Sequence, residues 1–153
     1  MSFESPTGTR GNRQPRGFVL ATFNRFAIRR IRAGKESVAG LNALVLTTVG
    51  RRSGEPRSTP LGWFPGEDGS WVVVASANGA AKNPAWYLNL AAHPDRVAID
   101  VAGEHVEVTA EQLHGEELDR AWGTVVAAAP RYAKYRESTD REIPLIKLTR
   151  RGS

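Results

Sequence analysis

Three arginines stand in one short segment of this 153-residue chain, and the segment begins with glycine. Residues 50–57 read Gly-Arg-Arg-Ser-Gly-Glu-Pro-Arg and follow a run rich in Leu, Val and Thr. Turn amides, with the planar bidentate donors of Arg51, Arg52 and Arg57, suit a phosphate or a carboxylate. The alternative is a basic hairpin tip in solvent. The segment is not a nucleotide-binding P-loop, because it lacks the Gly-Lys-Ser/Thr ending and leads to a strand.

A hydroxyl, a loop of small residues and a helix start follow one another over residues 76–86. Ser76 ends a Val-rich strand, the loop carries Lys82, and Pro84 stands where a first helical residue is expected. Helix N-termini attract anions, and Trp86 is placed to cover a planar ring. An equally good interpretation is a plain strand–helix connection in which Trp86 anchors the core.

Two tyrosines and one basic helix are weaker candidates. The spacing of Tyr132 and Tyr135 puts both phenols on one helical face, where they line a pocket or, as spacing alone favours, simply pack. Residues 17–33 predict an amphipathic helix with a basic face. That helix either contacts anionic lipid or, as we slightly favour, covers the fold with a solvated face.

Composition narrows the chemistry further. The chain has no cysteine and three scattered histidines, so we expect no disulfide, thiolate catalyst or metal site. A net charge of +5 favours an anionic partner. Base-stacking aromatics typical of RNA recognition are not evident, so we do not expect a nucleic-acid partner. No apolar signal core or spanning segment is evident, which predicts a cytoplasmic location.

The order of predicted elements indicates an α+β fold. Six short strands linked largely as hairpins, with helices outside, favour a small closed or split β-barrel over a doubly wound sheet. Pro60 predicts an edge strand or a bulge. We expect a flexible arm over residues 1–15 and one domain over residues 16–150. The predicted strands are 41–49, 57–64, 70–76, 96–101, 105–112 and 144–149, and the predicted helices are 17–33, 85–92 and 116–128.

Three ordered blocks of this sequence resemble the deazaflavin (F-420)-dependent nitroreductase family of actinobacteria. They are Leu-Val-Leu-Thr-Thr-x-Gly-Arg-Arg-Ser-Gly-x-Pro-Arg-Ser-Thr-Pro-Leu at 44–61, Lys-x-Pro-Ala-Trp-Tyr-Leu-Asn-Leu at 82–90, and Tyr-Ala-x-Tyr at 132–135 followed by Thr-Asp-Arg-Glu-Ile-Pro. The resemblance implies a split β-barrel of the FMN-binding type. It also implies coenzyme F-420, with its planar ring, phosphodiester and oligoglutamate tail, and hydride transfer to a quinone, nitroaromatic or activated enone.

The resemblance also assigns residues. Ser76, Tyr132 and Tyr135 become the catalytic candidates. The acceptor pocket is implied at Trp63, Trp86, Ala129, Tyr132 and Tyr135. Cofactor binding is implied at Arg51, Arg52, Ser53, Arg57, Thr59, Pro60, Ser76, Ala77, Asn78, Gly79, Lys82, Pro84, Ala85 and Trp86.

Two departures from the family pattern bear on the acceptor. Trp63 stands where Tyr is common, and Ala129 stands where an aromatic is common, so we expect a reshaped and wider pocket. The alternatives are an FMN-dependent oxidoreductase with the same barrel and a non-catalytic cofactor-binding protein. We expect a monomer or a homodimer, with membrane contact through helix 17–33 as a further option.

Overall fold

The computed structural model describes residues 18–38, 41–76, 83–139 and 141–151, together with Phe3, Gly8 and Gly11. Apart from those three residues, the predicted arm over residues 1–15 lies outside the described residues. The predicted cofactor contacts Ala77, Asn78, Gly79 and Lys82 lie outside them as well.

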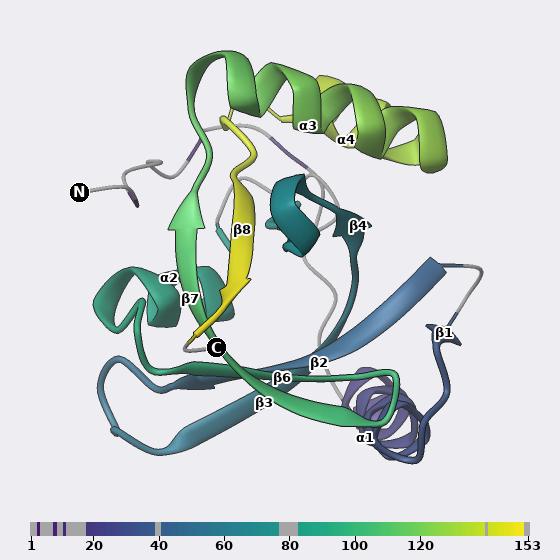
Figure 1. The fold of residues 1–153 in the computed structure, drawn as a ribbon, viewed down its shortest axis with the longest axis vertical. Helices are drawn as coiled ribbons and strands as arrows, with labels where there is room; N and C mark the ends of the chain where they lie inside the picture. The colour runs from purple at the N-terminus through teal and green to yellow at the C-terminus, as the bar shows by residue number, and fades with distance from the viewer. Residues whose placement is uncertain are drawn as a thin grey trace.

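The described strands form one antiparallel sheet in the order β1-β2-β6-β7-β8-β5-β4, with β3 paired to β2 (Figure 1). The strands are β1 (Ser37–Val38), β2 (Leu41–Val49), β3 (Pro56–Gly62), β4 (Phe64–Pro65), β5 (Trp71–Val74), β6 (Val97–Val101), β7 (Glu104–Gln112) and β8 (Leu145–Arg150). The helices are α1 (Phe18–Arg32), the 3-10 turn η1 (Glu67–Gly69), α2 (Ala85–Ala92), α3 (Gly115–Ala128) and α4 (Arg131–Ser138).

The long strand β7 curls the sheet into a split barrel. Its first half pairs with β6 from Glu104 to Val108, and its second half pairs with β8 from Val108 to Gln112. Figure 1 shows β7 turning from the layer of β2, β3 and β6 into the upright layer of β8. Because strand residues alternate between faces, this curl leaves one face inside the barrel and the other outside.

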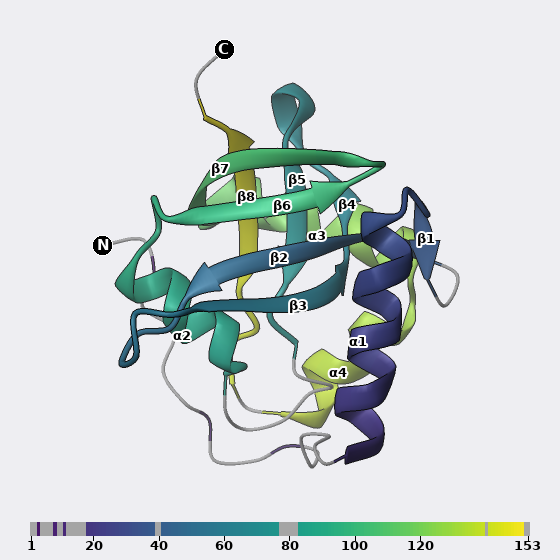
Figure 2. The same ribbon diagram turned by 90° about the horizontal axis from the view of Figure 1, so that it is seen from below.

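Three apolar clusters occupy these faces. The inner cluster fills the barrel, and α2 packs into it through Trp86, Tyr87 and Leu90. The outer cluster lies between the outside of β5 and β8 and the helices α3 and α4. A small third cluster holds α1 on β2 through Ile31, and Figure 2 shows α1 lying across the strands at the end away from α2.

The predicted α+β split barrel is confirmed, with differences in detail. The strand predicted over 57–64 ends at Gly62, and Phe64 instead belongs to β4, which pairs with β5. Two two-residue strands, β1 and β4, raise the described strand number to eight. Pro60 lies on β3, which pairs with β2 alone among the described strands, so its missing N–H is tolerated at an edge. Pro84 flanks α2 instead of starting it.

Candidate active site

The cationic turn between β2 and β3 is closed by its own backbone. Gly50 donates to the Glu55 carbonyl at 2.8 Å, Gly54 donates to the Gly50 carbonyl at 2.9 Å, and the Ser53 hydroxyl accepts from the Glu55 N–H. A Cβ atom at Gly50 would lie 2.6 Å from the Ser53 hydroxyl oxygen, so any other residue there would displace the Ser53 side chain. The turn is therefore a preformed scaffold for the arginines.

The arginines of this turn are exposed and have no ionic partner among the residues that the structure describes. The side chains of Arg51, Arg52 and Arg57 make no ion pair or side-chain hydrogen bond there. Elsewhere, Arg32, Arg120 and Arg150 each pair with a carboxylate. Uncompensated guanidinium groups on a closed turn form the kind of surface that attracts a polyanion.

Asn89 fixes the cationic turn against α2. Its side-chain carbonyl accepts a hydrogen bond from the Arg51 backbone N–H at 3.1 Å, and its amide donates to the Thr48 hydroxyl at 3.2 Å. Both Asn89 and Thr48 are buried. Figure 2 shows the β2–β3 turn beside α2, at the end of the sheet opposite α1. Two segments that were predicted to bind the cofactor are thus brought together.

Arg141 organises the second predicted segment. Its Nη1 donates to the Ala75 carbonyl at 2.9 Å and to the Asn83 side-chain oxygen at 2.6 Å, and its Nη2 donates to the Ser76 carbonyl at 2.7 Å. The side chain is buried, and desolvation lowers the pKa of the Arg141 guanidinium. The end of β5 is therefore tied to the residue that precedes Pro84 and α2.

The predicted site residues around α2 are divided between surface and core. Ser76 is half-buried, Ala85 is exposed, and Pro84 is buried. Trp86 is 9% exposed and belongs to the inner cluster, so most of its ring serves the core. On β3, Thr59 and Pro60 are half-buried opposite Leu46 and Val45.

Tyr132 and Tyr135 lie on the outer side of the sheet. Tyr132 packs edge-on against Phe64 with ring centroids 5.7 Å apart, and Tyr135 packs edge-on against Tyr132 at 5.4 Å. Burial raises the pKa of the Tyr132 phenol, because it penalises the charged form. Packing against Phe64 thus explains the buried position of Tyr132. The Tyr135 side chain is half-buried beside it.

The predicted acceptor pocket draws on both clusters. Trp63 and Trp86 pack with the inner cluster, whereas Ala129, Tyr132 and Tyr135 pack with the outer one. Along β5, Val73 faces the inner cluster and Val72 and Val74 face the outer one. The two groups of pocket residues therefore pack on opposite faces of the sheet.

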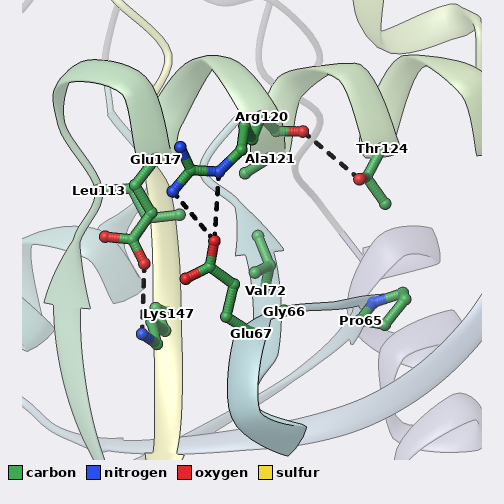
Figure 3. Close-up of a pocket in the computed structure, with 10 residues that line it drawn as sticks. All are labelled: Pro65, Gly66, Glu67, Val72, Leu113, Glu117, Arg120, Ala121, Thr124 and Lys147. Carbon is green, nitrogen blue, oxygen red and sulfur yellow. Dashed lines mark hydrogen bonds and ion pairs between the residues drawn. The ribbon is translucent and has the colours of Figure 1, made fainter.

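A cleft of about 310 Å³ opens elsewhere, between η1, the outer face of the sheet and α3 (Figure 3). Two ion pairs line it: Arg120 with Glu67 at 3.0 Å and Lys147 with Glu117 at 3.2 Å. It contains none of the predicted site residues. Its charged side chains already neutralise one another. We therefore interpret the cleft as the groove left where α3 packs on the sheet, and not as the site for an anionic ligand.

The sheet is curled and antiparallel with helices outside it, and Asn89 fixes the arginine-bearing turn against α2. Within the described part of the chain these arginines have no ionic partner, so the class is a split-barrel protein suited to an anionic cofactor. The family model described as F420H(2)-dependent quinone reductase matches residues 24–150. An F420H(2)-dependent quinone reductase of Mycobacterium tuberculosis strain H37Rv is 39% identical over 112 residues, which cover 71% of this chain and 74% of the relative. The chain belongs to the F420H(2)-dependent quinone reductase family.

Solved structures agree with this assignment. A structure described as an F420-H2 dependent reductase, FDR-A, superposes with a TM-score of 0.62 at 37% identity, covering 69% of this chain and 92% of that one. Another, described as a domain-swapped dimer, superposes with a TM-score of 0.65 at 32% identity, covering 86% and 99%. The chain is thus an F420-dependent oxidoreductase that passes hydride to a small organic acceptor.

The described residues fit this cofactor. A polyanionic tail needs cations that are not already neutralised, and Arg51, Arg52 and Arg57 meet that condition within the described part of the chain. In contrast, the cations of the cleft in Figure 3 are paired with carboxylates. The exposed guanidinium groups of the β2–β3 turn are therefore chemically suited to such a tail.

Neither Asn89 nor Arg141 is among the site residues predicted from the sequence. Both stand inside the segments that carry the family resemblance, but each is one polar residue in a helix or a loop when seen in the sequence. Their importance is visible only in the tertiary structure, where each is buried and forms hydrogen bonds with residues distant in the sequence.

Proposed function

We propose that the acceptor is a quinone, that the β2–β3 turn holds the cofactor tail, and that the end of β5 and the start of α2 hold its ring. The observation that supports this most is the turn that carries Arg51, Arg52 and Arg57, which have no ionic partner among the described residues and which Asn89 fixes beside α2. In this proposal the cofactor tail also contacts Ser53, Thr59 and Pro60. The cofactor ring contacts Ser76, Pro84, Ala85 and Trp86. Ala77, Asn78, Gly79 and Lys82 belong to the same proposal on the family pattern.

When bound, reduced F-420 supplies the hydride, so the protein's task is binding, orientation and electrostatics. The Ser76 hydroxyl makes no hydrogen bond to a described residue and is half-buried, so it is available to an acceptor oxygen. Tyr135 offers a second hydroxyl, held by its edge contact with Tyr132. In the proposed mechanism, one of these hydroxyls steadies negative charge that develops on the acceptor oxygen.

The acceptor pocket is proposed beyond the end of β5, with residues of both clusters as its walls. Trp63 and Trp86 form its inner wall, and Ala129, Tyr132 and Tyr135 its outer wall. Ala129 is a small residue of the outer cluster, and in this proposal its lack of an aromatic ring favours a broad planar acceptor.

Helix α1 supports a further part of the proposal, contact with anionic lipid. Phe26 is 57% exposed, and the Arg30 guanidinium lies 5.4 Å from its ring centroid. Arg25 and Arg29 are also exposed, whereas Ala27 and Ile31 on the other side are buried. An exposed ring among arginines suits the boundary between lipid headgroups and acyl chains. No helix of the described residues is both long and apolar enough to cross a membrane.

The test is a fluorescence titration of the purified protein with oxidised F-420, run beside FMN. Saturable binding of F-420 alone, followed by oxidation of F-420H2 on addition of a quinone, is the expected result. Preference for FMN would favour the flavin alternative. Tight F-420 binding without turnover on quinones, nitroaromatics or enones would favour a cofactor-binding protein, and both outcomes would overturn the proposal.

A further inference from the structure

Arg141 connects the two sides of the proposed site. Its backbone N–H donates to the Thr139 hydroxyl at 3.1 Å, just beyond the end of α4. Its guanidinium reaches Ala75, Ser76 and Asn83. The helix that carries Tyr132 and Tyr135 is therefore joined through one side chain to the end of β5 and the approach to α2.

The chemistry of this link requires arginine. A planar guanidinium presents several N–H donors in a fixed fork, so it holds two successive carbonyls and a side-chain amide at the same time. Lysine keeps the charge but offers a single nitrogen that cannot occupy two of these positions. Burying a charged side chain is costly unless its hydrogen bonds are made, so the geometry around Arg141 is strongly constrained.

The carbonyls that Arg141 holds are those of Ala75 and Ser76, directly at the proposed catalytic hydroxyl. Fixing the Ser76 carbonyl limits rotation of the backbone that carries the hydroxyl. Fixing Asn83 limits the position of Pro84 and the first turn of α2, where Trp86 lies. The described contacts therefore control where the hydroxyl stands relative to the ring side of the site.

We infer that Arg141 is a positioning residue, which sets the Ser76 hydroxyl against the start of α2 and against the tyrosines of α4. The inference rests on the proposed function, because it gives Ser76 its role at the acceptor. Arg141 itself needs no contact with cofactor or acceptor. Its effect on hydride transfer passes through Ser76.

The experiment compares R141K with wild type and with R150K. Arg150 is an exposed arginine on β8 that forms an ion pair with Glu104. It serves as the matched control. Three quantities are measured: amide hydrogen exchange at Ala75 and Tyr87 in the protein alone, the dissociation constant for oxidised F-420, and the single-turnover rate of F-420H2 oxidation by a quinone. N83A is a milder second variant that removes one acceptor of the guanidinium.

For R141K we expect faster exchange at Ala75, an F-420 dissociation constant raised about tenfold, and a rate lowered about tenfold or more. In a double-mutant cycle, R141K should change the rate less than about twofold once Ser76 is alanine. N83A should shift the same quantities less, and R150K should shift none.

Unchanged F-420 affinity and rate in R141K would overturn the inference, whatever the change in melting temperature. Additive effects of R141K and S76A on the rate would also overturn it. If wild type binds no F-420, the proposed function fails, and the inference fails with it as a statement about catalysis. Exchange at Ala75 then still reports whether Arg141 holds the end of β5, so the two failures are distinguishable.

Discussion

Asn89 and Arg51 are joined by a hydrogen bond of 3.1 Å between the Asn89 side-chain carbonyl and the Arg51 backbone N–H, across 38 positions of the chain. The other end of the Asn89 amide bonds to the Thr48 hydroxyl. One buried amide therefore places the tip of the cationic turn against α2. The orientation of the arginines depends on this contact as well as on their own turn.

Replacement of Asn89 by alanine should lower both stability and cofactor affinity. The buried Thr48 hydroxyl and the Arg51 N–H would lose their partner, at a cost of about 1–3 kcal/mol in the free energy of unfolding. Chemical denaturation and F-420 titration measure the two effects. N42A is the control, because Asn42 is an exposed asparagine on β2, the strand that carries Thr48. Equal behaviour of N89A and N42A would contradict the role given to Asn89.

Removal of the turn cations should weaken F-420 binding without unfolding the protein. R51Q, R52Q and R57Q are each expected to raise the dissociation constant about tenfold, since a charge-assisted hydrogen bond contributes roughly 1.5–3 kcal/mol before screening. The affinity of wild type should also fall with added salt, and that dependence should be shallower in the variants.

The control for this series is R150Q, which removes an exposed arginine on β8 that is paired with Glu104. It changes net charge by the same amount as each turn variant. If R150Q weakens binding as much as R51Q does, the effect belongs to overall charge, and the turn has no special role.

Loss of a proposed catalytic hydroxyl should slow hydride transfer and leave cofactor affinity largely unchanged. S76A and Y135F, measured by single-turnover oxidation of F-420H2 with a quinone, are expected to lower the rate by about 10²-fold where the hydroxyl steadies the acceptor oxygen. T124A is the control. It removes a hydroxyl that donates a hydrogen bond to the Arg120 carbonyl in the cleft of Figure 3, and it should leave the rate unchanged. Wild-type rates in both S76A and Y135F would exclude these hydroxyls.

Tyr132 should make the protein less stable in alkali. Burial raises the pKa of its phenol in the folded state, so the folded protein holds that proton more tightly than the unfolded chain. Its contribution is fully present below the unfolded pKa, near pH 10, and is lost as pH rises through the folded value.

Denaturation of wild type and Y132F between about pH 8 and 11 tests this dependence. Y132F keeps the ring that packs on Phe64 but has no ionisable proton. The fall in unfolding free energy should therefore be shallower in Y132F, by at most about 1.36 kcal/mol per pH unit. Identical slopes would show that Tyr132 does not titrate as its burial requires.

The exposed ring of α1 should govern binding to anionic lipid. Wild type is expected to sediment with vesicles that contain phosphatidylglycerol and to remain in solution with purely zwitterionic vesicles. F26S should weaken that binding without changing the melting temperature, because Phe26 is exposed in the folded protein. Equal binding to both vesicle types, or no effect of F26S, would leave α1 as a covering helix with a solvated face.

Much of the fold followed from local sequence. Alternation in residues such as 105–112 and the Val-rich run ending at Val74 predicted strands, because a half-buried strand repeats every two residues. Gly and Pro at 50–56 marked the turn and so located Arg51 and Arg52 at its tip. The family blocks carried the cofactor and the reaction class. Trp63 and Phe64 were predicted to continue the strand over 57–64. Nothing in these two residue types indicates that the chain leaves β3 before them and that Phe64 pairs with β5.

Local sequence was thus enough to predict the six longer strands approximately, the basic turn and the family, since these depend on neighbouring residues. The polar residues that hold the site together could be recognised only from the tertiary structure. Arg141 reaches Ser76 across 65 positions and Asn83 across 58, and no local pattern encodes such distances. Tertiary packing also put Trp86 and Tyr132 on opposite faces of the sheet, because α2 packs in the inner cluster and α4 packs in the outer one. Buried hydrogen bonds form where distant segments meet, so their partners become visible only once the chain has folded.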